Sequence, residues 1–361
     1  MVIALPPTGR WAAPARQAPD PARFRPDIEG FRAIAVVLVI AFHAGLPPIT
    51  GGYIGVDVFF VISGFLITGL LVDELQRTGT LSFRSFYARR IRRLMPMAML
   101  VLVAVAIGME FFTPPAYRPS VRFDALSAAF YYSNWQFAIE SVNYLTLGGA
   151  QNPVLHYWSL SVEEQFYLAW PLLLFLAVRL RPFGLSGGSV RLRCGAAIAV
   201  VGAASLVYSL VETPAEPAIA YFETTTRVWE FAAGAVLALV ASHLQRVPRS
   251  LAVVGGVTGL LLVLVAALVN GPTTAFPGTT ALVPVAGALL VLAMGARVPS
   301  SGAGALLSLR PVRYVGRISY TWYLWHWPCL VYARTAHWAP PDGQIGWLAT
   351  SIALAISLVL A

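Results

Sequence analysis

The sequence predicts an all-α polytopic membrane protein with about ten transmembrane helices. Hydrophobic residues make up 58% of the 361 residues and charged residues only 11%, whereas soluble domains average about 45–50% and about 25%. Apolar stretches recur at roughly the 20-residue length that a helix needs to cross a bilayer. Arginine clusters fall between these stretches, as the positive-inside rule expects of cytoplasmic loops. Together these observations exclude an ordinary soluble domain.

We expect ten spans, taken in chain order from the apolar stretches. They lie near 33–49, 55–72, 96–112, 163–180, 194–211, 228–243, 251–269, 280–296, 318–335 and 345–361. If the weaker candidate 123–140, "FDALSAAFYYSNWQFAIE", also crossed, every later arginine cluster would face outward. We therefore expect a re-entrant or surface helix near 123–140 and a multi-pass protein of the inner (plasma) membrane, with a cytoplasmic N-terminus.

Two parts complete the predicted organisation. Residues 1–26 carry Arg and Pro without an apolar signal core, which predicts a disordered cytoplasmic tail. Residues 27–361 form the transmembrane domain, and because the chain stops at Ala361 within an apolar run, we expect a truncated C-terminal end. The net charge of +9 comes from short clusters between spans, which indicates cytoplasmic loops rather than a nucleic-acid surface. Cys194 and Cys329 form no metal-ligand pattern.

The first span, "FRAIAVVLVIAFHAG", places two ionisable residues, Arg32 and His43, eleven positions apart. At 100° per residue this is three turns plus about 20°, so both side chains share a face, roughly 16 Å apart along the axis. His43 either marks the outer end of the span or performs chemistry inside the membrane, where ionisable groups usually face a cavity. We expect His43 to sit in a cavity connected to the cytoplasm and not to pack against lipid.

The stretch "SFYARRIRRLMP" carries a second basic cluster just before a span. It is either a positive-inside signal or a phosphate site, since Arg90 and Arg93 share a helical face and guanidinium groups bind phosphate bidentately. A cytoplasmic donor that bears phosphates, such as a coenzyme A ester, fits the second interpretation.

The stretch "HYWSLSVEEQFYLAWP" combines acids with aromatic residues. Ser159 and Ser161 are candidate caps of a helix whose first turn holds Glu163 and Glu164. Two acids and an amide beside aromatic rings exceed what capping needs, and this combination is suited to hold sugar hydroxyls. The outward-facing segment 113–162 is correspondingly either an aromatic interfacial belt or an acceptor-binding surface.

Three further positions are candidates. Arg227 and Glu230 in "TTTRVWEFAAGA" are three apart and form either a buried pair or part of a site. His326 in "ISYTWYLWHWP" precedes Pro328, which should disturb its helix. Asp57 at the outer mouth of the second span either orients a histidine or faces water.

Taken together, these motifs resemble the membrane-bound acyltransferase-3 family of bacterial O-acyltransferases, which modify sugars on lipopolysaccharide, glycolipids, peptidoglycan precursors and macrolides. They occur in family order from residue 28 to about 328. The matching pieces are "IEGFRAIAVVLVIAFHAG", "GGYIGVDVFFVISGFLIT", "SFYARRIRRLMP", "LHYWSLSVEEQFYLAWP", "TRVWEFAAGA" and "ISYTWYLWHWP". The family's closing Ser-Tyr…Val-Glu-x-Pro motif and the SGNH domain of many members do not follow.

The resemblance implies an acyl-CoA co-substrate, acetyl-CoA in our expectation, on the cytoplasmic side and a glycan or glycolipid acceptor reached from outside. We expect no bound cofactor, no metal and no nucleic-acid partner. By position, Arg32 and His43 match the signature Arg-x10-His pair, Arg90 and Arg93 the Arg-x-x-Arg motif, and Glu163 the acid of the Trp-Ser-Leu motif.

The resulting hypothesis assigns catalysis to His43 and Glu163, and donor binding to Arg32, Arg90 and Arg93. Acceptor binding or orientation is assigned to Asp57, Trp158, Gln165, Arg227, Glu230 and His326. Two alternatives remain open. Ten spans with intramembrane charges also describe a secondary transporter, although no paired internal halves are evident. The second alternative is an inactive, truncated member of the family.

Overall fold

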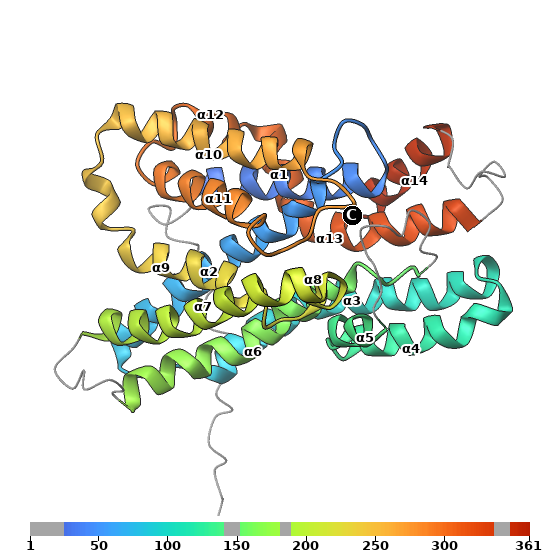
Figure 1. Ribbon diagram of the computed structural model, residues 1–361, viewed down its shortest axis with the longest axis horizontal. Coiled ribbons are helices and arrows are strands. Elements are labelled where there is room, and N and C mark those ends of the chain that lie inside the picture. The colour runs from blue at the N-terminus through green and yellow to red at the C-terminus, as the bar shows by residue number, and fades with distance from the viewer. Residues whose placement is uncertain (1–24, 141–151, 181–188, 336–346) are drawn as a thin grey trace, which may run out of the picture.

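The computed structural model describes residues 25–140, 152–180, 189–335 and 347–361, and these residues form helices and connecting turns without a strand. Every predicted span coincides with a helix (Figure 1). The ten helices are α1 (Pro26–His43), α2 (Gly55–Thr78), α3 (Phe83–Phe112), α6 (Tyr157–Arg179), α7 (Val190–Ala215), α9 (Val228–Val240), α10 (Arg249–Val269), α11 (Leu282–Gly295), α13 (Arg310–Thr335) and α14 (Trp347–Leu360). Shorter helices are α4 (Arg118–Ala129), α5 (Ser133–Ile139), α8 (Pro217–Phe222) and α12 (Ala303–Leu307), with 3₁₀ turns at Gly52–Ile54, Pro115–Tyr117 and His243–Arg246.

Two expected boundaries are corrected by the structure. The first span was expected to reach residue 49, but α1 ends at His43, because Gly45 adopts φ 68° and Pro47 cannot continue a helix. The third span was expected to begin near residue 96, but α3 starts at Phe83 and continues through Pro96, so the basic cluster lies in the same helix as the apolar stretch. Arginine is a good helix former, so nothing separates the cluster from the apolar part of that helix.

The segment 123–140 is divided between two helices, α4 and α5. Between them lies the turn at Tyr131, the one non-glycine residue with positive φ (56°) in the described part of the chain. α4 runs back along the C-terminal part of α3, to which Glu110 attaches it through Arg118 and Arg122. α5 packs on α6. The segment is therefore a helical hairpin against the bundle.

The bundle is held by pairs of helices that are distant in sequence. α1 packs against α13, α2 against α9, and α10 against α11. In Figure 1, α10, α11 and α12 lie in the upper part of the molecule and α6 and α7 in the lower part, with α2 between them. α2 and α9 approach closely, because a Cβ on Gly64 would lie 2.0 Å from the Phe231 carbonyl oxygen and one on Gly234 2.1 Å from that of Val61. Small residues at helix crossings are typical of membrane bundles.

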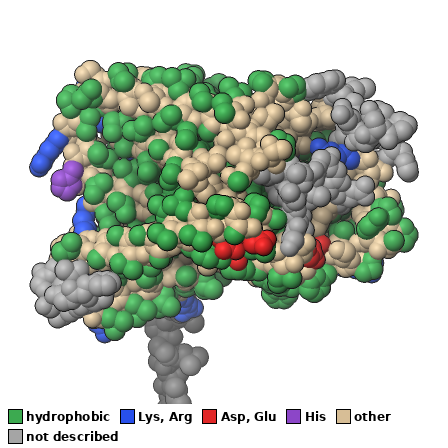
Figure 2. Space-filling view, viewed as in Figure 1, with side chains coloured by type: hydrophobic (Ala, Val, Ile, Leu, Met, Phe, Trp, Pro, Cys, Tyr) green, Lys and Arg blue, Asp and Glu red, His purple; other side chains and the backbone are tan. Residues whose placement is uncertain are grey.

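The exposed surface is strongly apolar. Along α3, the side chains of Val103, Ile107 and Phe111 are 57%, 59% and 78% exposed, and hydrophobic side chains are spread widely over the described part of the face in Figure 2, with few charged ones between them. Exposed apolar area on this scale indicates contact with lipid. Four helical segments of the described residues are long and apolar enough to cross a membrane, namely 52–78, 83–112, 190–215 and 249–269. The full number of spans stays a prediction.

Candidate functional site

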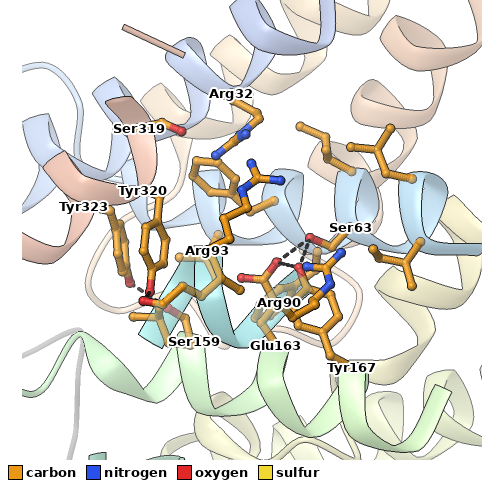
Figure 3. Close-up of a pocket in the computed structure, with 18 residues that line it drawn as sticks. Arg32, Ser63, Arg90, Arg93, Ser159, Glu163, Tyr167, Ser319, Tyr320 and Tyr323 are labelled. Atoms are coloured by element: carbon orange, nitrogen blue, oxygen red, sulfur yellow. Dashed lines mark hydrogen bonds between the residues drawn. The ribbon is translucent and has the colours of Figure 1, made fainter. Parts of the chain in front are cut away.

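Side chains from five helices line a cavity of about 120 Å³ inside the bundle (Figure 3). α1 contributes Arg32, and the first turns of α3 contribute Arg90 and Arg93. The remaining polar lining comes from α2, α6 and α13: Ser63, Ser159, Glu163, Tyr167, Ser319, Tyr320 and Tyr323. The structure thus brings together four of the predicted site residues, Arg32, Arg90, Arg93 and Glu163, from three separate motifs.

The cavity carries an excess of positive charge. Three guanidinium groups line it, but Glu163 is the one carboxyl group among its described lining residues. None of the three arginines forms a hydrogen bond or ion pair with a residue that the structure describes. Arg90 instead stacks on Tyr167, with its Cζ 3.8 Å from the ring centroid. Unpaired guanidinium groups around a cavity are suited to bind a phosphorylated ligand.

Glu163 is held by neutral partners rather than by the arginines. Ser63 Oγ and Tyr167 Oη both donate to its carboxylate, and these two hydroxyls lie 3.0 Å apart. The arrangement follows from spacing, since Ser159, Glu163 and Tyr167 are four residues apart and share one face of α6. All three line the cavity.

The capping interpretation of this segment is wrong. α6 begins at Tyr157 and has no side-chain cap at its first turn, so Ser159 and Ser161 lie inside the helix. Their hydroxyls bond to neighbouring helices, Ser159 to Tyr323 at 2.7 Å and Ser161 to Ser133 at 2.8 Å. The serines therefore connect helices instead of starting one.

Three buried histidines cluster next to the cavity. His43 of α1 is 6% exposed, while His326 of α13 and His156, which immediately precedes α6, are fully buried. Nδ1 of His43 lies 2.7 Å from Nε2 of His326, across 283 residues of sequence. The ring of His156 meets that of His326 edge-on, with centroids 5.6 Å apart.

Ser159 and Tyr323 separate the cavity from the histidine cluster. Both line the cavity, and Tyr323 Oη also donates to the backbone oxygen of His156 at 3.0 Å. On its other side, the Tyr323 ring lies 5.3 Å from that of His326. His43 is not among the described residues that line the cavity. The expectation that His43 itself sits in the cavity is therefore not met, because His43 lies beyond the wall formed by Ser159 and Tyr323.

Asp57, Arg227 and Glu230 form a separate, fully buried ion triad. Nη1 of Arg227 lies 3.1 Å from Oδ1 of Asp57 and 3.2 Å from Oε1 of Glu230. The same guanidinium donates twice to the Tyr221 carbonyl oxygen. Asp57 is 1% exposed, so the alternative in which it faces water is wrong. The predicted Arg227–Glu230 pair is present. None of the three triad residues is among the described residues that line the cavity.

Trp158 and Gln165, two predicted acceptor residues, serve packing contacts. Trp158 is fully buried, with its ring 4.8 Å from that of Tyr221 and Arg227 above it. Gln165 donates to the Tyr131 carbonyl oxygen at 2.8 Å and accepts from Trp135 Nε1 at 3.1 Å. These bonds fix the α4–α5 hairpin on α6. Within the predicted outward-facing segment 113–162, residues 141–151 lie outside the described residues.

Some functional candidates were missed by the sequence reasoning. His156 is the first residue of the motif "HYWSLSVEEQFYLAWP" but was not predicted as a site residue, although its position beside the two acids of this motif was a signal. Tyr167 was detectable by its spacing of four from Glu163. Ser63 and Tyr323 gave no signal, because their importance comes from partners on other helices.

Comparisons with known proteins show which family the chain resembles. A family profile described as "Acyltransferase domain" matches residues 25–361. Peptidoglycan O-acetyltransferase OatA of Listeria monocytogenes is 33% identical over 316 residues, and O-acetyltransferase OatA of Staphylococcus aureus 30% over 331 residues. YrhL of Bacillus subtilis is 35% identical over 318 residues. The matches cover 85–90% of this chain but 49–53% of each relative, so the chain spans about half their length. No solved structure matches.

Proposed function

Because this chain belongs to the acyltransferase-3 family, we propose that it is an integral membrane O-acyltransferase that transfers an acetyl group from acyl-CoA to a hydroxyl of an extracytoplasmic glycan. The observation that carries this proposal is the cavity in which Arg32, Arg90 and Arg93 meet one carboxyl group. Relatives named as peptidoglycan O-acetyltransferases favour a cell-wall glycan over a glycolipid as the acceptor.

The three arginines suit the donor end of the reaction. Coenzyme A carries several phosphate groups, and guanidinium groups bind phosphate through paired hydrogen bonds. Arg90 and Arg93 lie near the start of α3, next to the basic residues that the positive-inside rule assigns to the cytoplasm. We therefore place the N-terminus and the donor on the cytoplasmic side of the inner membrane.

His43 suits the acceptor end. It lies eleven residues after Arg32 on the same helix, roughly 16 Å further along the axis. In the proposed step, His43 takes the proton of the acceptor hydroxyl while the oxygen bonds to the acetyl carbonyl carbon. The carbon–sulfur bond of the thioester breaks, and the proton passes to the departing thiolate. Glu163, held by two hydroxyls on the cavity wall, orients the reacting groups.

A radiolabel assay tests this function. Membranes that contain the chain receive labelled acetyl-CoA and a peptidoglycan-derived glycan, and we expect a base-labile acetyl ester on the glycan. His43→Ala should lower the rate by about 10²- to 10⁴-fold, the usual value of a general base, while the matched control Arg118→Ala retains it. Ester formation by His43→Ala at the wild-type rate would exclude His43 as the base. Passage of label across proteoliposomes without any ester would indicate a transporter.

A further inference from the structure

A chain of hydrogen bonds fixes the protonation of two histidines in the cluster. Nδ1 of His326 lies 2.5 Å from the carbonyl oxygen of Tyr323. A carbonyl oxygen only accepts, so this nitrogen carries the hydrogen. In a neutral imidazole the other nitrogen, Nε2, is then an acceptor. Since Nε2 of His326 lies 2.7 Å from Nδ1 of His43, His43 must donate from Nδ1.

The consequence for His43 is a defined tautomer. With its hydrogen on Nδ1, the neutral ring of His43 has its lone pair on Nε2. This is the nitrogen that a general base uses when its other nitrogen is held by a neighbour, as in serine hydrolases, where a carboxylate holds it. Here the holding group is a second imidazole. A neutral partner costs less to bury in an apolar bundle than a carboxylate does.

Pro328 explains why α13 can orient its histidines. In an α-helix, residue 328 would donate its N–H to the carbonyl of Leu324, but proline has no N–H. The Leu324 oxygen instead accepts from His156 Nε2 at 3.0 Å. One turn of α13 thus uses two carbonyl groups, those of Tyr323 and Leu324, to fix two imidazoles.

The surroundings of His43 come from several elements. His326, Trp327 and Arg334 face it from α13: the Trp327 ring lies 4.7 Å from its ring, and Arg334 donates to its backbone oxygen at 2.7 Å. His156 approaches from the start of α6, behind His326. The hydrogen bond between the rings of His43 and His326 joins α1 to α13.

We propose that His326 is a positioning residue, which holds His43 in the Nδ1–H tautomer so that its Nε2 acts as the base. This role rests on the proposed acetyl transfer. When Nε2 of His43 takes a proton from the acceptor hydroxyl, the ring becomes an imidazolium whose Nδ1–H bond to His326 strengthens. His326 itself neither touches the substrate nor changes its own proton.

Two near-isosteric variants of the full chain in native membranes test the role. The amide oxygen of His326→Gln replaces Nε2 as an acceptor for His43, whereas the shorter amide of His326→Asn bonds Tyr323 but does not reach His43. We expect kcat to fall about 100-fold or more in His326→Asn and within about tenfold in His326→Gln. The KM for acetyl-CoA should stay within about twofold in both, because the arginine cavity is unchanged. His156→Gln is the matched control for altering a buried imidazole.

Three results would overturn the proposal: equal losses in the Gln and Asn variants, a rise in KM that accounts for the loss, or an equal loss in His156→Gln. A second measurement does not depend on activity. ¹⁵N NMR of histidine-labelled wild-type protein in lipid should show protonated Nδ1 and bare Nε2 on His43, assigned by comparison with His43→Ala. The opposite tautomer would contradict the proposal even if acetyl transfer is observed. Absence of acetyl transfer with the expected tautomer would instead contradict the proposed function.

Discussion

Arg227 and the three arginines of the cavity differ in whether the protein itself supplies a partner for their charge. Arg227 is 1% exposed and bonds Asp57, Glu230 and the Tyr221 carbonyl oxygen. Aromatic rings lie on its faces, with the centroids of Tyr221 and Phe276 each 5.0 Å away. Each of its neighbours is thus a fixed part of the fold.

The cavity arginines show the opposite arrangement. Arg32, Arg90 and Arg93 converge on one space and bind no carboxylate among the described residues. Removing one partner from a buried, paired charge is strongly destabilising, whereas charges gathered around a cavity remain available for a ligand. From this contrast we propose that Arg227 supports the fold and that the cavity arginines bind a ligand, although sequence motifs marked Arg227 and the cavity arginines alike as site residues.

The largest expected effect is the loss of stability when Arg227 is replaced. Arg227→Leu leaves two buried acids without their cation, and breaking a buried pair in this way costs about 3–5 kcal/mol. We expect a large fall in the thermal unfolding temperature of the detergent-solubilised protein and in its membrane yield. Adding Asp57→Asn and Glu230→Gln, which removes the unpaired charges, should restore much of the stability. A stable Arg227→Leu protein that has lost acetyl transfer would return Arg227 to the acceptor site.

An intermediate effect is expected in the cavity. A hydrogen bond to a charged group contributes about 1.5–3 kcal/mol, so Arg90→Ala and Arg93→Ala should each raise the KM for acetyl-CoA about 10- to 100-fold. The thermal unfolding temperature should stay close to that of the wild type. Arg90→Lys keeps the charge but not the planar fork, and we expect it to recover only part of the affinity. Initial rates over a range of donor concentrations measure these values. Loss of stability without a change in KM would show that these arginines support the fold.

The smallest effect is expected at the ion pairs of Glu110, which have short distances but are partly exposed. Arg118 and Arg122 bind Glu110 at 2.9 and 2.6 Å, distances as short as those in the triad. Glu110 is 44% exposed, however, and exposed pairs contribute about 0–1 kcal/mol. Arg118→Ala should therefore change the unfolding temperature little and leave acetyl transfer intact. A loss comparable to that of Arg227→Leu would mean that short distance alone decides the contribution.

Much of the fold was predictable because helix formation and apolar length are local properties. The ten expected spans correspond to helices, and the shared face of Arg90 and Arg93 follows from the helical period. The misplaced boundaries also have local causes, since Gly45 and Pro47 end α1 early and nothing interrupts α3 after its arginines. The hairpin of α4 and α5 was seen only as one re-entrant or surface segment, because nothing in the sequence marked the turn at Tyr131.

The site was predictable only in part. Family motifs marked Arg32, His43 and Glu163, whereas Tyr167 was missed although helical periodicity places it on the same face as Glu163. The sequence by itself determined which residues occupy which helix and which face. Tertiary structure alone decided that His43 meets His326, that Asp57 meets Arg227, and that Ser159 and Tyr323 form a wall. These contacts depend on how helices cross, and the crossings are set by the packing of small residues such as Gly64 and Gly234, far from the groups they bring together.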